Sequence, residues 1–456
     1  MTGLAAIVDI GKTHIKLHVL DESGEPLEAF QLTNQVVTGA PYPHYDTNAH
    51  WNWLLDTLAQ FDAAGDISSI VPVTHGAAAA LVDGSQLVLP ILDYEYEDVA
   101  ACDPQYELLR DSFEDSLSPK LPAGLNLGQQ IFWQQQNFPE AFSRATALLL
   151  YPQYWAWRLS GVMATELTSL GAHSDLWRPA QRVFSTLVSR MALTPLFPPV
   201  QPAWQALGTI RQDVAKRTGL PEHCEVFCGI HDSNASYLRH IKDQEEDVTV
   251  VSTGTWVICM GGAVAASHLD EQRDMLANVD AFGRPIPCAR FMGGREYAAI
   301  SEAVGKQAHS GPTEAGIYVQ QGTMALPSFA RTGGPFMGQT GDFIYGNPDS
   351  TVDGPTLGSL YCALVTDYCL DRLESTGHIV IEGPFIADEV FTGTLAALRP
   401  TQTVSTSADA TGTVSGAHLL ARWEQRQERP ALEQITLLDF SGLSRYRDQW
   451  RNASLA

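Results

Sequence analysis

One pattern occurs twice in this sequence: a short apolar run, a turn rich in glycine and hydroxyl residues, and a second apolar run. The first copy flanks residues 9–14, and the second flanks residues 252–255. Each copy predicts a strand, a tight turn and another strand. Because the copies lie about 240 residues apart, we expect a duplicated α/β fold in which each hairpin opens one domain.

The length of the chain supports this division. A chain of 456 residues is too long for one hydrophobic core, so we expect two domains, residues 1–240 and 241–456. No apolar run approaches the roughly 18 residues of a membrane span, and residues 1–8 do not resemble a secretory leader. We therefore expect a cytoplasmic protein that does not contact membranes.

Charge and cysteine usage exclude two further classes of protein. The chain has 28 Lys+Arg against 52 Asp+Glu, a formal net charge of −24, which leaves no basic stripe for a nucleic acid. ATP is not excluded, because a mononucleotide needs only a few local donors. The seven cysteines form no Cys-x-x-Cys pair, which argues against a zinc module and for buried, reduced thiols.

The first turn combines side chains suited to phosphate chemistry. Gly11 lets backbone N–H groups approach phosphate oxygens closely, and Thr13 adds a hydroxyl. Lys16 adds a positive charge, and Asp9 offers a carboxylate that can organise Mg²⁺ through its waters. The same residues are also compatible with an ordinary hairpin that has a polar turn.

Polar residues follow two other predicted strands, at the position where open α/β sheets bind ligands. His75 comes directly after the β-rich run 69–74, and either a ligand contact or a surface or core histidine fits that position. Asp232 follows segment 225–230 and precedes small residues that open a helix. This placement suits a general base, and it equally suits a simple helix cap.

Further segments have two interpretations each. The acidic and aromatic segment 93–98 follows a predicted strand at 87–92, and it either hydrogen-bonds sugar hydroxyls or begins an exposed helix. Segment 291–296 either lines a sugar pocket or is structural.

Residues 378–385 predict a buried strand that ends in a Gly-Pro turn, and residues 411–417 open a helix. Glycines at these two sites can let a nucleotide lie against the backbone. Periodicity also predicts helices over residues 129–137, 139–150 and 357–373.

Taken in order, these motifs resemble the FGGY family of carbohydrate kinases within the actin-like ATPase superfold. The resemblance covers most of the chain and rests on six ordered segments. These are Asp9-x-Gly11-x-Thr13-x-x-Lys16, His75-Gly76, Pro152-Gln153-Tyr154-Trp155 with Arg158-Leu159-Ser160-Gly161, Gly229-x-x-Asp232-x-x-Ala235, Thr253-Gly254-Thr255, and Glu382-Gly383-Pro384 with Gly412-Thr413 and Gly416-Ala417.

The resemblance implies two ribonuclease H-like domains around a central cleft and transfer of the ATP γ-phosphoryl group to a sugar hydroxyl, with Asp232 as general base. Implied contacts to ATP come from Asp9, Gly11, Lys12, Thr13, Lys16, Thr253, Gly254, Thr255, Gly383, Pro384 and Gly412. Implied contacts to the sugar come from Thr74, His75, Gly76, Asp93, His231 and Asp232. Asp9 and Asp232 are implied to hold Mg²⁺.

Four positions depart from the family pattern. Lys12 stands where Thr or Ser is commoner, Gln130 replaces a Lys, and Thr74 replaces a Gln. A Gly-Gly-Gly run is reduced to Glu-Gly-Pro at residues 382–384.

We expect a ketose substrate, xylulose first and rhamnulose or fuculose next, and a monomer or homodimer. Two other functions stay open, a non-catalytic sugar or nucleotide sensor and an actin-like ATPase that acts on a protein partner.

Overall fold

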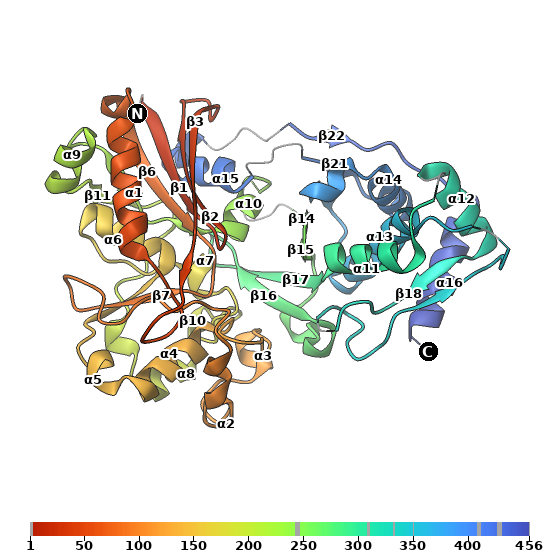
Figure 1. The fold of residues 1–456 in the computed structure, drawn as a ribbon, viewed down its shortest axis with the longest axis horizontal. Coiled ribbons are helices and arrows are strands. Elements are labelled where there is room, and N and C mark those ends of the chain that lie inside the picture. Colours follow the sequence, from red (N-terminus) through yellow and green to blue (C-terminus); the bar gives the residue numbers. More distant parts are fainter. Residues whose placement is uncertain are drawn as a thin grey trace. The chain divides into compact units, whose positions relative to one another are not determined.

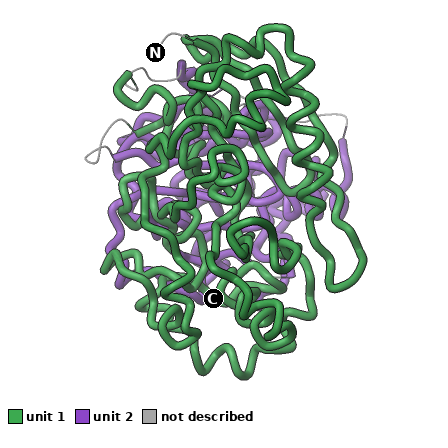
Figure 2. The backbone as a smooth tube through the Cα atoms, turned by 90° about the vertical axis from the view of Figure 1, so that its left-hand side faces the viewer, with its two compact units in different colours: residues 1–244, 277–285, 411–429 green, residues 245–276, 286–410, 430–456 purple. Residues whose placement is uncertain are grey.

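The structure is a computed structural model that describes residues 3–241, 247–307, 311–331, 333–349, 351–407, 412–425 and 431–455. The chain forms two compact units, coloured separately in Figure 2. Unit 1 comprises Met1–Gln244, Ala277–Pro285 and Thr411–Arg429, and unit 2 comprises Glu245–Leu276, Ile286–Ala410 and Pro430–Ala456. The predicted division at residue 240 gives each domain one stretch of chain, whereas each unit here is assembled from three.

A mixed sheet forms the centre of unit 1 (Figure 1). Its order is β11-β12-β6-β1-β2-β3, and β13 also pairs with β6. The three consecutive strands β1, β2 and β3 are antiparallel, whereas β6 and β12 run parallel to β1. The bounds are β1 Leu4–Ile10, β2 His14–Leu20, β3 Pro26–Thr33, β6 Ile67–Thr74, β11 Ala206–Thr209, β12 Glu225–Phe227 and β13 Ile230–His231.

Helices cover this sheet because its central strands are apolar on both faces. Ile7 and Val8 of β1 are adjacent, so they point to opposite faces, and both are fully buried. Helix α6 and helix α15 pack on β6, and α15 also packs on β1 and on α10. The bounds are α1 Thr47–Gln60, α6 Tyr151–Ser160, α9 Gln212–Thr218, α10 Asp232–Leu238 and α15 Gly412–Ala421.

A second hydrophobic cluster of unit 1 lies under the hairpin of β7 (Ala79–Val82) and β8 (Ala147–Leu150). Here two predictions are wrong. The helix predicted over 139–150 ends at Phe142, because residues 147–150 are all buried and pair with β7 as a strand. The strand predicted at 87–92 makes only isolated bridges, since Pro90 interrupts it.

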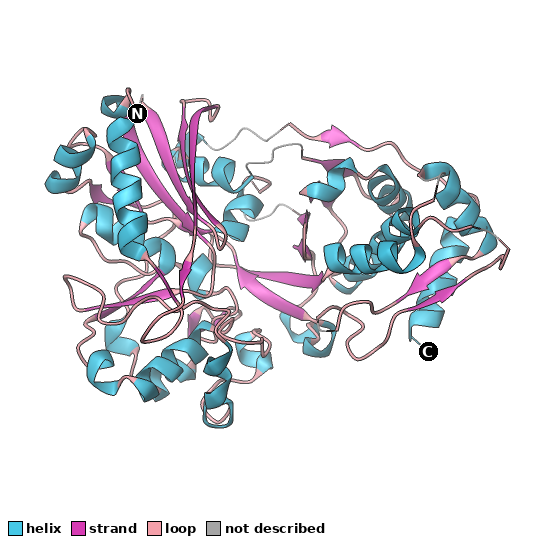
Figure 3. Cartoon of the chain, in the orientation of Figure 1, coloured by secondary structure: helices cyan, strands magenta, loops and turns pink. Residues whose placement is uncertain are grey.

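Unit 2 repeats the topology of unit 1, as the duplicated hairpins predicted. Its sheet has the order β16-β17-β15-β14-β20-β21-β22, with β14 and β15 antiparallel and β20 parallel to β14. Figure 3 shows these strands and the helices beside them. The bounds are β14 Val248–Thr253, β15 Val257–Met260, β16 Met275–Val279, β17 Pro285–Phe291, β20 His378–Glu382, β21 Val404–Thr406 and β22 Glu433–Gln434. Two ribonuclease H-like units are therefore present, which confirms the predicted fold class.

Helix α13 (Gly354–Arg372) forms much of the core of unit 2, as predicted for 357–373. Within the described ranges, no helix combines the length and the apolarity that crossing a bilayer requires. All seven cysteines are described, and each is buried and outside any disulfide.

The remaining elements are short or peripheral to the sites described below. The helices are α2 Asp103–Tyr106, α3 Phe113–Ser116, α4 Leu127–Asn137, α5 Pro139–Phe142, α7 Leu167–Leu170, α8 Thr186–Arg190, α11 Gly293–Val304, α12 Pro312–Gln321, α14 Glu389–Leu398 and α16 Leu443–Leu455. The strands are β4 Val36–Val37, β5 His44–Tyr45, β9 Trp177–Arg178, β10 Val183–Phe184, β18 Met324–Leu326 and β19 Asp342–Ile344.

Candidate active site

The turn between β1 and β2 is held in one shape by its own backbone and by a neighbouring strand end. The N–H of Gly11 donates to the carbonyl of His14 at 2.9 Å, and the Asn34 amide donates to the Gly11 carbonyl at 2.8 Å. Asp9 lies directly opposite Lys16 in the β1–β2 register. The turn therefore presents a carboxylate and an ammonium side by side, with Thr13 exposed at its tip.

Asp9 is a half-buried carboxyl close to a second carboxyl. Burial, and after it the negative charge of Asp232, raise the pKa of Asp9 to about 7, although Lys16 acts in the opposite direction. A carboxyl with this pKa is protonated in about half of the molecules near neutral pH. Asp9 lies near the beginning, and Asp232 near the end, of the first stretch of chain in unit 1. The fold therefore brings together two residues that are 223 positions apart in the sequence.

Asp232 is the first residue of α10 rather than its cap, because the N-cap position is His231. Its Oδ1 accepts hydrogen bonds from the backbone N–H of Ser233 at 2.6 Å and from the hydroxyl of Ser233 at 3.3 Å, and it lies 3.1 Å from Nε2 of His231. The described residues donate nothing to its other oxygen, Oδ2. Asp232 therefore has one oxygen fixed and one oxygen open, while its side chain stays 32% exposed.

His231 is placed to orient Asp232. Burial lowers the pKa of His231, so the ring is neutral, although the charge of Asp232 opposes that effect. The carboxylate can only accept, so Nε2 carries the proton, and Nδ1 then accepts from the amide of Asn234 at 3.0 Å. The backbone N–H of His231 donates to the hydroxyl of Thr168, which fixes the chain as well as the ring.

Two glycines make room for this arrangement. A Cβ at Gly76 would lie 2.9 Å from Nε2 of His231, so only glycine lets the imidazole rest against this backbone. Gly229 has φ of +85°, and a Cβ there would overlap the carbonyl oxygen of Pro72. Both glycines therefore position the His231–Asp232 pair by leaving room for neighbouring atoms.

His75 offers a hydrogen-bond acceptor to a ligand. Burial lowers the pKa of His75 to about 4, so its ring is neutral at physiological pH. Nδ1 contacts the carbonyl of Gly76 at 2.7 Å and must be the protonated nitrogen. Nε2 is buried with an unshared lone pair and without a partner among the described residues. Thr74, by contrast, directs its hydroxyl to the carbonyl of His75 at 2.9 Å and is fully buried.

Lys12 and Asp93 form an ion pair beside this histidine. The ammonium of Lys12 binds Asp93, lies 3.2 Å from Glu95 and stands 4.7 Å from the ring centre of Tyr94. Asp93 also accepts from the hydroxyl of Tyr45 at 3.2 Å. Lys12, predicted on the ATP side, is thus engaged by residues of segment 93–98. This segment and the β1–β2 turn line a hollow of about 680 Å³ in unit 1.

Two residues that the motifs did not single out as ligand contacts build this region. Gln130 lies in α4, and its amide binds the carbonyls of Ala77 and Gly124, which fixes the loop after His75. Tyr151 is buried with its ring centre 5.1 Å from that of His75 and 5.8 Å from that of Tyr45. The sequence marked Gln130 only as a departure, and it marked Tyr151 only as one member of an aromatic-dense run.

In unit 2 the second turn is tied to the end of β20. The hydroxyl of Thr253 donates to the Glu382 carbonyl and accepts from the backbone N–H of Phe385 at 3.1 Å. This hydroxyl is therefore used inside the protein. Of the other predicted contacts in this turn, Gly254 is half-buried and Thr255 is exposed.

The predicted adenosine side divides between the two units. Pro384 lines a hollow of about 560 Å³ in unit 2 together with Phe385, Tyr297, Asp388 and others, and Gly383 precedes it at φ of +84°. Gly412 lies in unit 1 instead, where a Cβ would lie 2.9 Å from Oγ of Ser236 on α10. Packing of α15 against α10 accounts for this glycine.

Segment 291–296, a candidate for the sugar side, contributes to the core of unit 2 through Glu296. It ends β17 and begins α11 in unit 2. The carboxyl of Glu296 is buried, and it accepts hydrogen bonds from the hydroxyl of Tyr361 and from the backbone N–H of Phe329. These contacts hold α11 in the core of unit 2.

The described residues contain no cluster of three or more His, Cys, Asp or Glu with the geometry of a metal site. The pair of Asp9 and Asp232 nevertheless suits a hydrated Mg²⁺, because a cation that keeps most of its waters needs only one or two carboxylates. Burial is the main cause of the raised pKa of Asp9, and the charge of Asp232 is the second; a divalent cation would relieve the repulsion between the two carboxylates.

Comparison with known proteins agrees with this geometry. Residues 4–238 match the N-terminal domain of the FGGY family of carbohydrate kinases, and residues 245–430 match the description "Carbohydrate kinase FGGY, C-terminal domain". The duplicated ribonuclease H-like fold and the acidic turn of unit 1 define a protein of the actin-like ATPase superfold. Within it, this chain belongs to the FGGY family of carbohydrate kinases.

Individual relatives have the same overall fold. A carbohydrate kinase of Novosphingobium aromaticivorans is 35% identical, with a TM-score of 0.90 over 100% of this chain and 99% of that chain. A xylulose kinase of Lactobacillus acidophilus, 14% identical with a TM-score of 0.78, covers 99% of both chains and shows the fold alone. An L-fuculokinase of Salmonella typhi is 26% identical over 300 residues, and the match spans 60% of each protein.

Proposed function

We propose that this protein is an ATP-dependent kinase that transfers the γ-phosphoryl group of ATP to a hydroxyl of a ketose. The observation that carries the proposal is the state of Asp232, whose Oδ1 is fixed by Ser233 and His231 while Oδ2 is open. A carboxylate held in this way can accept a proton in one defined direction. The family of the chain supports the reaction class.

In this mechanism Oδ2 of Asp232 takes the proton of the attacking sugar hydroxyl. His231 keeps its own proton on Nε2, which holds the carboxylate in place and disfavours its rotation. Nε2 of His75 accepts a hydrogen bond from another hydroxyl of the sugar and so orients it. Asp93 and Lys12 contribute an acceptor and a donor on the same side.

On the nucleotide side, the backbone around Gly11 and the hydroxyl of Thr13 donate to phosphate oxygens, with Lys16 adding charge. Gly254 and Thr255 of unit 2 act in the same way, and Gly383 and Pro384 contact the adenosine. Mg²⁺, held through its waters by Asp9 and Asp232, would neutralise charge on the transferred phosphoryl group. The division of roles follows the expected domains, 1–240 for the sugar and the first phosphate loop and 241–456 for the second loop and adenosine.

The substrate is proposed within the ketoses and deoxyketoses. Relatives named L-fuculokinase and xylulose kinase support this class, although the chain spans only about three fifths of the length of these curated relatives. Xylulose stays our first candidate, with rhamnulose and fuculose next. We further propose that the protein works in the cytoplasm as a monomer or homodimer.

The test is coupled ADP release with Mg-ATP across a panel of ketoses, deoxyketoses and polyols, with a control that lacks sugar. Release that depends on one sugar supports the kinase, whereas equal release without sugar would show an ATPase. Tight ATP binding with no release on the whole panel would favour a sensor.

The residue test compares Asp232→Ala with Asp66→Ala, which changes an exposed aspartate on the same unit. We expect Asp232→Ala to lower kcat by about 10²- to 10⁴-fold while ATP still binds. Near-normal turnover in that variant would show that Asp232 is not the base.

A further inference from the structure

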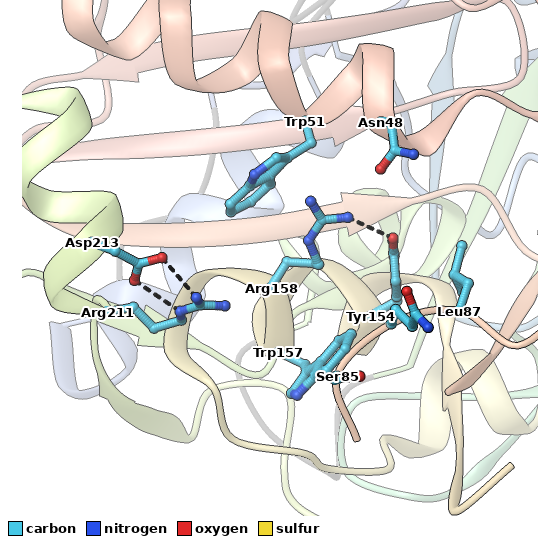
Figure 4. A pocket seen from close by; sticks show the side chains of 10 residues that line it. Asn48, Trp51, Ser85, Leu87, Tyr154, Trp157, Arg158, Arg211 and Asp213 are labelled. Atoms are coloured by element: carbon cyan, nitrogen blue, oxygen red, sulfur yellow. Dashed lines mark hydrogen bonds and ion pairs between the residues drawn. The ribbon is translucent and has the colours of Figure 1, made fainter. Parts of the chain in front are cut away.

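A pocket of about 370 Å³ in unit 1 lies outside the site described above. Figure 4 shows its wall, which comes from the start of α1, the loop after β7, α6 and the start of α9 with the residue before it. Its volume falls within the range of small-molecule sites. None of its lining residues belongs to the cluster around His75 and Asp232.

The pocket is separated from the transfer site by aromatic side chains. The ring centre of Trp51, in the pocket wall, lies 6.4 Å from that of Trp155, which lies 6.1 Å from that of Tyr151. Tyr151 in turn contacts His75. Two buried rings, Trp155 and Tyr151, therefore stand between the two sites, and one small ligand cannot fill both.

Arg158 supplies the chemistry of this pocket. Its guanidinium lies 4.4 Å from the ring centre of Trp51, and one nitrogen donates to the hydroxyl of Tyr154 at 2.8 Å (Figure 4). In the described part of the chain no carboxylate pairs with it, whereas the nearby Arg211 donates through two of its three nitrogens to Asp213. The pocket therefore carries one uncompensated positive charge.

This charge is unusual because the protein as a whole carries a net charge of −24. A protein with this net charge repels small anions over most of its surface. A guanidinium that is held against an aromatic ring attracts them at one place. An arginine has five N–H donors, and one bond to Tyr154 leaves a fork that can hold a phosphate. Trp51 and Trp157 add flat apolar faces of the kind on which sugar rings rest, and Asn48 adds a polar group at the rim.

We propose that this pocket is a second ligand site that binds a phosphorylated sugar, with the phosphate on Arg158 and the sugar against Trp51 and Trp157. Free phosphate shares the anionic chemistry but lacks the ring, so it binds the same residues more weakly. Arg158 and Tyr154 belong to the segment 152–161, which the transfer reaction leaves without a role.

The test is titration of the full-length protein with glucose 6-phosphate, inorganic phosphate and neutral glucose, an aldose outside the proposed ketose substrates, followed by calorimetry and by tryptophan fluorescence. We expect glucose 6-phosphate to bind and to change the fluorescence, phosphate to bind more weakly, and glucose to do neither. Arg158→Gln should raise the dissociation constant about tenfold or more, since it removes a charged hydrogen-bond partner. Arg158→Lys should recover part of the affinity, because it restores the charge without the fork.

A second variant does not disturb the packing of Arg158. Asn48 is exposed in the first turn of α1, so Asn48→Asp places a carboxylate beside the pocket and should also weaken binding. Asn52→Asp, on the same helix but outside the pocket lining, is the matched control and should bind as the wild type does.

A third variant, Lys12→Met, alters the transfer site. If the phosphate ester binds there instead, its binding would be lost in Lys12→Met and kept in Arg158→Gln. Loss of binding in Lys12→Met with binding kept in Arg158→Gln would overturn the proposal. So would unchanged affinity in both Arg158→Gln and Asn48→Asp, and so would the absence of binding by either phosphate probe.

Discussion

Replacing Asp9 with Asn removes a carboxyl whose pKa is raised from 3.8 to about 7, first by burial and then by the charge of Asp232. A raised carboxyl pKa in the folded state means that ionisation opposes folding. Below pH 3.8 the carboxyl is protonated in both states and has no effect on the free energy of unfolding. Between pH 3.8 and 7 the unfolded chain ionises first, so the stability of the wild type falls as the pH rises, and it then levels off.

The size of this effect follows from the shift. Each unit of pKa corresponds to about 1.4 kcal/mol, so the rise of Asp9 costs the folded protein about 4 kcal/mol at pH 8 as an upper bound. The part of this cost already present at pH 5 is about 1.6 kcal/mol, so Asp9→Asn should gain roughly 2–3 kcal/mol more at pH 8 than at pH 5. If unit 1 melts as a body of about 270 residues, a 4 kcal/mol gain raises its Tm by about 7 °C.

The assay is thermal unfolding of wild type, Asp9→Asn and the exposed control Asp62→Asn at pH 5 and pH 8, in the presence of a chelator. Taking the difference between the two pH values cancels any effect of the substitution that does not depend on ionisation. Asp9→Asn should be stabilised at pH 8 and should also lose sugar phosphorylation. A gain that is equal at both pH values, or absent at pH 8, would refute the reasoning that Asp9 is a strained carboxyl.

Two further predictions concern the sugar side. Gly76→Ala places a Cβ 2.9 Å from Nε2 of His231, so kcat should fall about tenfold while ATP affinity stays unchanged. The control is Gly39→Ala, whose Cβ meets only an ordinary contact. Equal kinetics in the two variants would contradict the positioning role of Gly76. Lys12→Met removes the partner of Asp93, and we expect a rise of about tenfold or more in KM for the sugar without a rise in KM for ATP. A rise confined to KM for ATP would instead place Lys12 on the phosphates.

The duplicated hairpins and the order of the motifs could be predicted from the sequence because they depend on local apolar runs and on glycine at tight turns. The strand at 147–150 could not, because three consecutive leucines continue a helical pattern equally well and only pairing with β7 decides between the two. The proximity of Asp9 to Asp232 is implied only by the family resemblance, and the ion pair of Lys12 with Asp93 could not be predicted. Both join residues from distant parts of the chain, and the residue pattern of a single sequence does not reveal such pairs.

Helix α15 has a consequence for how the protein is made. It covers strands β1 and β6 and helix α10, yet it lies about 400 residues after β1 in the chain. Val414, Ala417 and Leu420 of this helix are buried in unit 1. A ribosome must therefore synthesise most of unit 2 before unit 1 can bury that face, although N-terminal domains commonly fold first during translation. A fragment that ends near residue 240 would therefore lack this helix and leave the same apolar face exposed to water.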